Sequence, residues 1–444
     1  MLQLPSSPET LVLDRFSLTD TQTDAPIPFW GILLQILTPP AKSSADLIDI
    51  LDTIAVTLRG RRDSDNGFLR NFLDTQYKDD RFFQNTAWAR CVEVALEMPT
   101  LFPEGRLTAL SSGNPSLKCS SRQIACLLVH QFLCTLPELP GDKDNSQDLH
   151  IWFSSEQPHP KAVNAYLTAL FTFFERIDIL SSPILFTLHA APHTPSIPPS
   201  LLFAPISITD VENPSVSLTL LGIPSGACVI SANSHIGFGR TASQEEVHIG
   251  CTPQTLPAKL LTPPLQPNEV LVLRGCEAVV EISGYGRTAE LRSIVPPGSR
   301  RRRTMLFMDA LELDSYDVAA STPDLLPGNV DRELTKAYTA FASGDPPYNP
   351  IVTGHWGCGA FGGNREIKSV IQWGAAALAG VRLDFVCDKN DSFARAFRRF
   401  TSQALSQQWR VERVIGVLRG MGPTDQGRLT AFETITSALS GASS

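Results

Sequence analysis

Two adjacent carboxyl groups, Glu245 and Glu246, follow a glycine-containing segment and are the first candidates for chemistry. Residues 233–246 read NSHIGFGRTASQEE. Two neighbouring carboxyls could act on a glycosidic bond, because one can protonate the leaving oxygen while the other holds the sugar. On a regular strand they would point to opposite faces, so only an irregular turn would let both face one ligand. The alternative interpretation is a solvated Glu-Glu pair beside a turn.

A second cluster, residues 353–364, reads TGHWGCGAFGGN and lies between the apolar pair Ile351-Val352 and a predicted helix. Glycines between a strand and a helix N-terminus can cradle a diphosphate, because backbone N–H donors and the helix dipole act together. Neither a Walker A pattern nor a Rossmann fingerprint is present. Trp356 and Phe361 favour an ordered loop over the alternative, a plain flexible turn.

Glycines also mark two smaller candidates. Gly237 and Gly239 lack a Cβ atom, so their backbone can approach an anion or a sugar closely. Tyr285, between Gly284 and Gly286, could lay its ring on a base or a sugar. Equally, Tyr285 could cap the hydrophobic core.

Other sequence features favour less specific interpretations. His235, His248 and Cys251 lack a fourth ligand at a recognised zinc spacing, so we expect no metal site and no cofactor. No G-x-S-x-G elbow supports a serine nucleophile. The run of four arginines at 300–303 could contact phosphates or direct nuclear import, and it could equally be an exposed loop.

The composition indicates a globular chain of more than one domain. The chain has 444 residues, 43% of them hydrophobic, and a formal net charge of −8. This charge argues against generic nucleic-acid binding, which would need a local basic patch. No secretory signal, membrane-spanning run or Cys-x-x-Cys pair is visible, and several of the nine cysteines lie in apolar stretches. We therefore expect a soluble intracellular protein with reduced, buried thiols.

Apolar spacing divides the chain near residue 200. Helical periodicity predicts helices at about 43–58, 86–96, 121–132 and 161–176. Residues 181–205 are rich in Pro and Ser and are predicted to form a linker. Beyond it the pattern predicts strands at about 217–221, 227–230, 269–273, 278–282, 305–309 and 381–386, and helices at about 333–341, 365–378 and 391–405. This alternation predicts an α/β sheet with a ligand site at the carboxyl ends of its strands.

Taken together, the motifs resemble the poly(ADP-ribose) glycohydrolase family. The segment TGHWGCGAFGG at 353–363 is similar to that family's TGNWGCGAFGGD loop, and IQW at 371–373 continues the match. RELTKAY at 332–338 resembles the family's RELNKAY, and the segments at 123–128 and 132–135 resemble its helical domain more loosely. The resemblance implies an α/β, macrodomain-like mixed sheet flanked by helices and preceded by an all-helical accessory domain. The expected division is an N-terminal segment at 1–42, a helical accessory domain at 43–195 and a macrodomain-like catalytic domain at 200–444.

The resemblance also implies roles for site residues. Glu246 would be the general acid and Glu245 would act beside it, with Asn233 on the ribose hydroxyls and Gln244 supporting the pocket. The remaining substrate-binding residues would lie around the ribose, the diphosphate and the nucleotide: Gly237, Gly239, Tyr285, Gly359, Ala360, Phe361 and Phe385.

Four departures from the family pattern concern this site. Phe238 replaces the second glycine of a GGG loop, the spacer before Gln244 is shortened to residues 240–243, Ile230 replaces an aspartate and His355 replaces an asparagine. Two functions therefore stay open. The chain could hydrolyse ribose–ribose bonds in poly(ADP-ribose) and release ADP-ribose. Alternatively, it could be an ADP-ribose or poly(ADP-ribose) binding module with weak or no turnover, because the loop at 237–243 is altered.

The resemblance implies partners and a cellular setting as well. We expect poly(ADP-ribose) and ADP-ribose as ligands, ADP-ribosylated proteins as further partners, and neither membrane association nor sequence-specific nucleic-acid binding. A nuclear or cytoplasmic location and a role in the DNA damage response follow from the family and from the arginine run.

Overall fold

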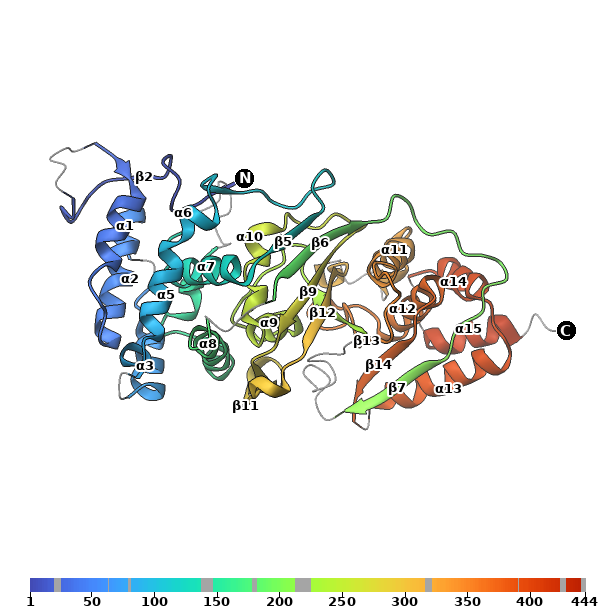
Figure 1. Cartoon of the computed structure of the whole chain (residues 1–444). Coiled ribbons are helices and arrows are strands. Elements are labelled where there is room, and N and C mark those ends of the chain that lie inside the picture. The colour runs from blue at the N-terminus through green and yellow to red at the C-terminus, as the bar shows by residue number, and fades with distance from the viewer. Residues whose placement is uncertain are drawn as a thin grey trace.

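The chain builds a helical part followed by a mixed sheet covered by helices on both faces (Figure 1). The computed structural model describes residues 1–19, 25–62, 64–78, 81–136, 147–177, 182–211, 225–315, 322–389, 391–423 and 429–440. The predicted strand at 217–221 lies outside these residues.

The helical part confirms the four predicted helices. They are α2 (Ser44–Arg59), α5 (Ala87–Leu96), α7 (Ser121–Phe132) and α8 (Pro160–Phe174), and α1 (Phe29–Leu37), α3 (Gly67–Gln76), α4 (Arg81–Gln84) and α6 (Met98–Leu101) join them. Capping boxes explain why α2 and α7 begin where they do. Ser43 pairs with Asp46, and Ser120 pairs with Gln123, so the first backbone N–H groups of both helices are satisfied.

Eight strands form one sheet in the order β5-β6-β9-β12-β8-β13-β14-β7. Their bounds are β5 (Ser116–Cys119), β6 (Ile184–Ala190), β7 (Ile206–Val211), β8 (Ala227–Ala232), β9 (Glu269–Glu277), β12 (Arg302–Asp309), β13 (Ile351–Thr353) and β14 (Leu383–Asp388). Pairs from β5 to β12 are antiparallel, and pairs from β12 to β7 are parallel. The carboxyl ends of β8, β12, β13 and β14 therefore meet at one edge.

Shorter strands form three separate pairs. They are β1 (Leu2–Gln3) with β4 (Arg106–Leu107), β2 (Leu11–Val12) with β3 (Ile27–Pro28), and β10 (Val280–Ser283) with β11 (Glu290–Ile294). The β10–β11 hairpin matters most here, because the turn that follows β10 carries Tyr285.

Alternation along the central strands creates two cores, one on each face of the sheet. In β9, Leu271 and Leu273 join the core that contains the helical part, whereas Val270 and Val272 join the core on the opposite face. The first face also holds α9 (Gln244–Gly250) and α10 (Ala258–Leu261). The second holds α11 (Asn329–Phe341), α12 (Arg365–Ala379), α13 (Ser392–Ser406), α14 (Val411–Gly420) and α15 (Ala431–Ser440).

Strand β6 corrects the prediction of a linker at 181–205. Ile184, Phe186 and Leu188 alternate with more exposed residues and are buried in the core beneath the helical part. In the sequence, the prolines and serines on both sides of this short strand obscure its alternation of buried and more exposed residues. Strands β5 and β6 belong to the same sheet as β8, β9, β12, β13 and β14. The domain boundary at 195–200 stays a prediction.

The arginine run does not form a uniform exposed loop. Arg302 and Arg303 begin β12, and Arg303 is 1% exposed and donates to Thr252 Oγ1 at 2.7 Å. The cysteines are all unpaired in the structure, and every one except the half-buried Cys358 is buried. Among the described helices, none combines the length and apolarity needed to cross a bilayer.

Candidate active site

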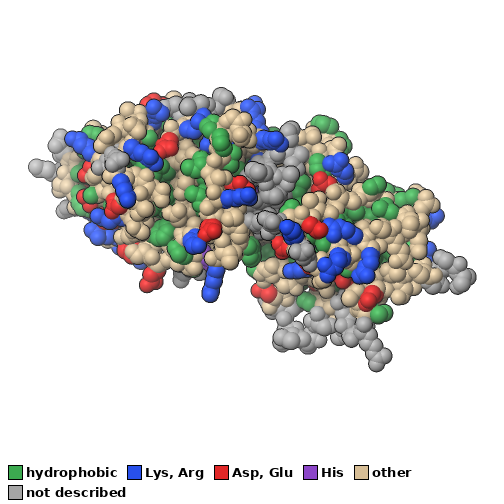
Figure 2. All heavy atoms as spheres, turned by 90° about the horizontal axis from the view of Figure 1, so that it is seen from below, with side chains coloured by type: hydrophobic (Ala, Val, Ile, Leu, Met, Phe, Trp, Pro, Cys, Tyr) green, Lys and Arg blue, Asp and Glu red, His purple; other side chains and the backbone are tan. Residues whose placement is uncertain are grey.

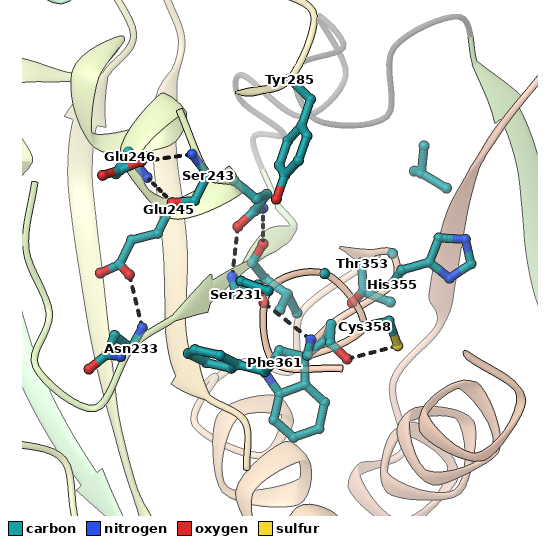
Figure 3. Close-up of a pocket in the computed structure, with 18 of the residues that line it drawn as sticks. Ser231, Asn233, Ser243, Glu245, Glu246, Tyr285, Thr353, His355, Cys358 and Phe361 are labelled. Atoms are coloured by element: carbon teal, nitrogen blue, oxygen red, sulfur yellow. Dashed lines mark hydrogen bonds between the residues drawn. The ribbon is translucent and has the colours of Figure 1, made fainter. Parts of the chain in front are cut away.

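A cavity of 480 Å³ opens at the carboxyl ends of β8, β13 and β14. This volume lies in the range of about 300–1,000 Å³ that is typical of small-ligand sites. Figure 3 shows Glu245, Glu246 and Asn233 on one side, His355 and Cys358 on the other, and Tyr285 above them. The lining residues come from three parts of the chain. They are 229, 231, 233, 235, 237, 238 and 243–246 from β8, α9 and the loop between them; 259 and 285; and 352–361, 365, 386 and 388 from β13, the glycine-rich loop, α12 and β14.

The first turn of α9 carries both carboxyls. Ser243 is the N-cap residue and forms a capping box with Glu246. Gln244 fixes this turn to the sheet, because its side chain accepts from Ser231 N at 2.7 Å and donates to Val229 O at 3.1 Å. The irregular turn expected from the sequence is therefore a helix start, which lets neighbouring carboxyls approach one cavity.

Glu245 is buried and held by backbone donors. Its two carboxyl oxygens accept from Asn233 N at 2.9 Å and from Gly237 N at 3.1 Å. Burial raises the pKa of Glu245 to about 8, and the charge of Glu246 adds to this rise, whereas the backbone donors and Lys259 oppose it. The Glu245 carboxyl is therefore largely protonated near neutral pH.

Glu246 is half-buried and bonded to the loop before it. Its carboxylate accepts from Thr241 Oγ1 at 2.7 Å, Ser243 N at 2.8 Å and Thr241 N at 3.3 Å. Gly239 makes this position possible, because a Cβ atom there would lie 1.7 Å from Glu246 Oε1. The Glu246 carboxylate can therefore occupy this position against the loop because residue 239 has no side chain.

The loop at 237–243 is anchored to the helical part. Trp152 donates its indole N–H to Gly239 O at 2.7 Å, and its ring meets that of Phe238 edge to face at 5.5 Å. Phe238 is 7% exposed, and Lys259 Nζ lies 4.9 Å from its ring centre. Phe238 therefore extends toward the helical part and anchors the shortened loop.

The glycine-rich loop at 353–364 presents three consecutive backbone donors. Among the residues that the structure describes, none accepts a hydrogen bond from the N–H of Gly359, Ala360 or Phe361. Gln372 fixes the start of the loop, accepting from Thr353 Oγ1 at 2.5 Å and donating to Gly354 O at 3.1 Å. Consecutive free N–H groups form a concave anion site.

A buried charge network supports this loop from below. Lys368, which is 1% exposed, pairs with Glu333 and lies 3.8 Å from Asp324 Oδ1. Its ammonium lies 5.0 Å from the ring centre of Trp356, a loop residue. Asp324 also accepts from Asn364 N at 2.9 Å. The network therefore fixes both the middle and the end of the loop.

His355 lines the cavity on the side away from the carboxyls. Its Nε2 lies 3.7 Å from Asp391 Oδ2, beyond hydrogen-bond distance, and neither ring nitrogen has a hydrogen-bond partner among the described residues. Burial lowers the pKa of His355 to about 4, and Arg365 acts in the same direction. The ring is therefore neutral at physiological pH.

The predicted site residues mostly meet at this cavity. Glu245, Glu246 and seven of the predicted ligand-contacting residues line it: Asn233, Gln244, Gly237, Tyr285, Gly359, Ala360 and Phe361. Gly239 does not line it, because it lies behind Glu246. Phe385 is fully buried and packs on His355 and Phe397, while the next strand residue, Val386, faces the cavity.

Several lining residues carry no sequence signal that points to a site. Lys259 and Arg365 are isolated basic residues without a motif, and Asp388 is the last residue of β14, a strand whose neighbours in the sheet are not encoded locally. Ile230 is a departure from the family pattern, but it is fully buried in the core of the helical face and does not line the cavity. Among the described residues, no three His, Cys, Asp or Glu side chains gather as metal ligands. His248 instead contacts Arg303 at 2.6 Å.

Family models match both halves of this arrangement. The model described as poly(ADP-ribose) glycohydrolase, helical domain, matches residues 75–189. The model described as poly(ADP-ribose) glycohydrolase, Macro domain fold, matches residues 223–395. The second match contains both walls of the cavity, and the two together confirm a helical domain followed by a macro-fold domain.

Curated relatives agree with the family models. Poly(ADP-ribose) glycohydrolase 1 of Caenorhabditis elegans is 26% identical over 47% of this chain and 29% of its own length. Poly(ADP-ribose) glycohydrolase 2 of the same organism is 26% identical over 43% of each chain. Probable poly(ADP-ribose) glycohydrolase 2 of Arabidopsis thaliana is 23% identical over 59% of this chain and 60% of its own. The matches thus span less than two thirds of each relative.

Proposed function

Because this chain belongs to the poly(ADP-ribose) glycohydrolase family, we propose that it hydrolyses the ribose–ribose bonds of poly(ADP-ribose) and releases ADP-ribose. One observation carries the proposal: the cavity is lined by two neighbouring carboxyls and also by a glycine-rich loop with three backbone N–H groups that have no partner among the described residues. A sugar and a diphosphate are the ligand groups that these two features suit.

In this proposal Glu246 is the general acid. It protonates the leaving ribose oxygen as the bond from that oxygen to the anomeric carbon breaks, and an oxocarbenium-like centre forms. Glu246 then accepts a proton from the water that attacks this carbon, which restores the acid and yields ADP-ribose. Glu246 must leave Thr241 to reach the substrate. Because Thr241 is exposed, solvent can replace this contact.

Glu245 holds the sugar in this scheme. Its oxygens are fixed by the backbone of Asn233 and Gly237, and its raised pKa leaves it a protonated carboxyl that can donate to a ribose hydroxyl. A neutral Glu245 also adds no negative charge to a cavity that is proposed to hold a diphosphate.

The diphosphate would bind the N–H groups of Gly359, Ala360 and Phe361, while Tyr285 packs on the nucleotide. This mode uses backbone dipoles and an aromatic ring, so it requires no positive field over the whole protein. It reconciles a net charge of −8 with a polyanionic ligand.

A second candidate function is binding of ADP-ribose or polymer without efficient turnover. The observation in its favour is that Glu246 accepts three hydrogen bonds from the shortened loop. If these contacts hold the carboxylate away from the leaving oxygen, ligand binding would persist and hydrolysis would be slow.

We also propose the setting that the family suggests. ADP-ribosylated proteins would be the carriers of the polymer, in the nucleus or cytoplasm, and the DNA damage response would be a process that supplies it. Fractionation of cells that express the tagged chain, with and without DNA damage, tests the location directly.

The decisive experiment compares wild type with Glu246→Gln on purified poly(ADP-ribose). We expect wild type to release ADP-ribose and the variant to lose at least about a hundredfold in rate, since general acids contribute about 10²–10⁴-fold. The dissociation constant for ADP-ribose should change little. Undiminished turnover in the variant would remove Glu246 from the acid role. A wild type that binds ADP-ribose but forms no product would establish the binding module instead.

A further inference from the structure

A second groove, of 760 Å³, adjoins the active-site cavity. Arg365 lines both hollows, so they share a wall. The groove lies at the N-termini of α12 and α13, and its lining is 364–366, 391–393, 396, 399, 429 and 430.

The groove adjoins the end of the cavity that is remote from the carboxyls. Arg365 Nη1 lies 3.2 Å from Asp391 Oδ2, and the same oxygen lies 3.7 Å from His355 Nε2. Figure 3 shows His355 on the side opposite Glu245 and Glu246. A ligand that occupies both hollows would therefore extend away from the bond being cleaved.

The charges in the groove suit phosphate. Its two carboxylates are already engaged: Glu366 accepts from Phe432 N at 2.8 Å, and Asp391 accepts from Phe393 N at 2.9 Å and from Arg365. Arg399 is exposed and forms no hydrogen bond or ion pair with any residue that the structure describes. Its planar guanidinium can bind a phosphate with two parallel hydrogen bonds.

Basic residues also dominate the helix that carries Arg399. Helix α13 contains Arg395, Arg398 and Arg399 and no acidic residue. Figure 2 shows Lys and Arg side chains gathered on the C-terminal half of the face seen from below. This local concentration contrasts with the net charge of −8 for the whole chain.

Apolar side chains complete the groove. Phe393 and Ala396 lie beside the arginine, and Leu429 is 48% exposed. An apolar surface next to a guanidinium suits a nucleotide, because the base can pack on the apolar side chains while the phosphate pairs with the cation.

We propose that this groove binds the neighbouring ADP-ribose unit of the polymer, joined through the adenosine ribose of the unit in the cavity. The inference rests on the proposed function, because only a polymeric substrate has such a neighbour. The enzyme would then hold two consecutive units on one side of the bond it cleaves, so that bonds inside the chain come within reach as well as the terminal one.

The test compares Arg399→Glu with Arg395→Glu, a matched control on the same helix. Arg395 is exposed, carries the same charge and does not line the groove. Both changes are made in the Glu246→Gln background, so that a short, length-defined ADP-ribose oligomer stays intact. We expect Arg399→Glu to weaken oligomer binding about tenfold, the loss of one charge-assisted hydrogen bond, and Arg395→Glu to weaken it by less than about twofold.

Binding of free ADP-ribose separates the outcomes. It should be the same for both arginine variants, because one unit fills only the cavity. Equal losses of oligomer affinity in the two variants, or a matching loss for free ADP-ribose in Arg399→Glu, would overturn the second subsite. Failure of wild type to hydrolyse polymer would refute the proposed function instead. Thermal melting controls for folding, since both side chains are exposed.

Discussion

Tyr285 and Gly359 meet across the mouth of the cavity: the Tyr285 hydroxyl lies 3.4 Å from the position that a Cβ atom would take on Gly359. Tyr285 follows β10, whereas Gly359 belongs to the loop after β13. The two walls of the cavity therefore approach each other closely above the proposed diphosphate site. A ligand bound there would be covered by the 48% exposed tyrosine ring.

Tyr285→Ala should weaken ADP-ribose binding about tenfold, since stacking on an aromatic ring contributes about 1–3 kcal/mol per base. The loss should appear in KM more than in kcat, because the proposed role of the ring is to pack on the nucleotide and not to transfer a proton. Tyr285→Phe keeps the ring and should retain most of the affinity. Calorimetry with ADP-ribose measures both variants, and equal losses in Ala and Phe would assign the effect to the hydroxyl.

Gly239→Ala should abolish most hydrolysis while preserving ADP-ribose binding. Its new Cβ atom would lie 1.7 Å from Glu246 Oε1, so the carboxylate has to move. Gly237→Ala is the matched comparison, because the atoms nearest to its Cβ atom would be those of the flexible Lys259 side chain, at 3.3 Å or more. We expect a much smaller loss of turnover there. The hydrolysis rates of the two variants on purified polymer test this prediction. Similar rates for Gly239→Ala and Gly237→Ala would show that the position of Glu246 does not depend on the glycine at 239.

Glu245 should make stability fall as pH rises. The folded pKa of about 8 lies above the ordinary value of 4.5, so between these values the folded state binds a proton that the unfolded state has released. The destabilisation is absent below about pH 4.5 and complete above about pH 8, where it is on the order of 5 kcal/mol. Glu245→Gln removes this titration and should show the weaker pH dependence.

Urea unfolding of wild type and Glu245→Gln at about pH 5 and about pH 8 measures this effect. The amide of the Glu245→Gln variant can accept only one of the two backbone hydrogen bonds that Glu245 accepts. This loss lowers the stability of the variant by the same amount at both pH values. The informative quantity is therefore the amount by which the difference in unfolding free energy between wild type and Glu245→Gln changes between the two pH values. A difference that does not vary with pH would show that Glu245 titrates normally.

Local signals made much of this fold predictable. The capping pair Ser120 and Gln123 marks the start of α7, and apolar periodicity continues to its end at Phe132. The motif at 353–364 is sufficient to predict an ordered loop at the cavity, because its glycines, its aromatics and the following helix are encoded within one short segment. Such features depend on neighbours in the chain.

Long-range contacts could not be predicted in this way. Trp152 and Gly239 are 87 residues apart, and no pattern in either segment indicates their hydrogen bond. Phe238 adds bulk to a glycine loop, yet its ring is accommodated by a tryptophan from the helical part. Lys368 likewise reads as an ordinary helix lysine until the fold surrounds it with Glu333, Asp324 and Trp356.

The core shared by the helical part and the sheet has a consequence for how the protein folds. Leu271, Phe307 and Ile230 of the sheet belong to the same hydrophobic cluster as Leu170 and Phe132 of the helices. Neither part can complete its interior alone, so the two should unfold in one cooperative transition. A fragment that begins near residue 200 would lack β5 and β6, exposing an edge of β9 that invites aggregation. The helical part is thus a folding partner of the sheet that carries the proposed active site.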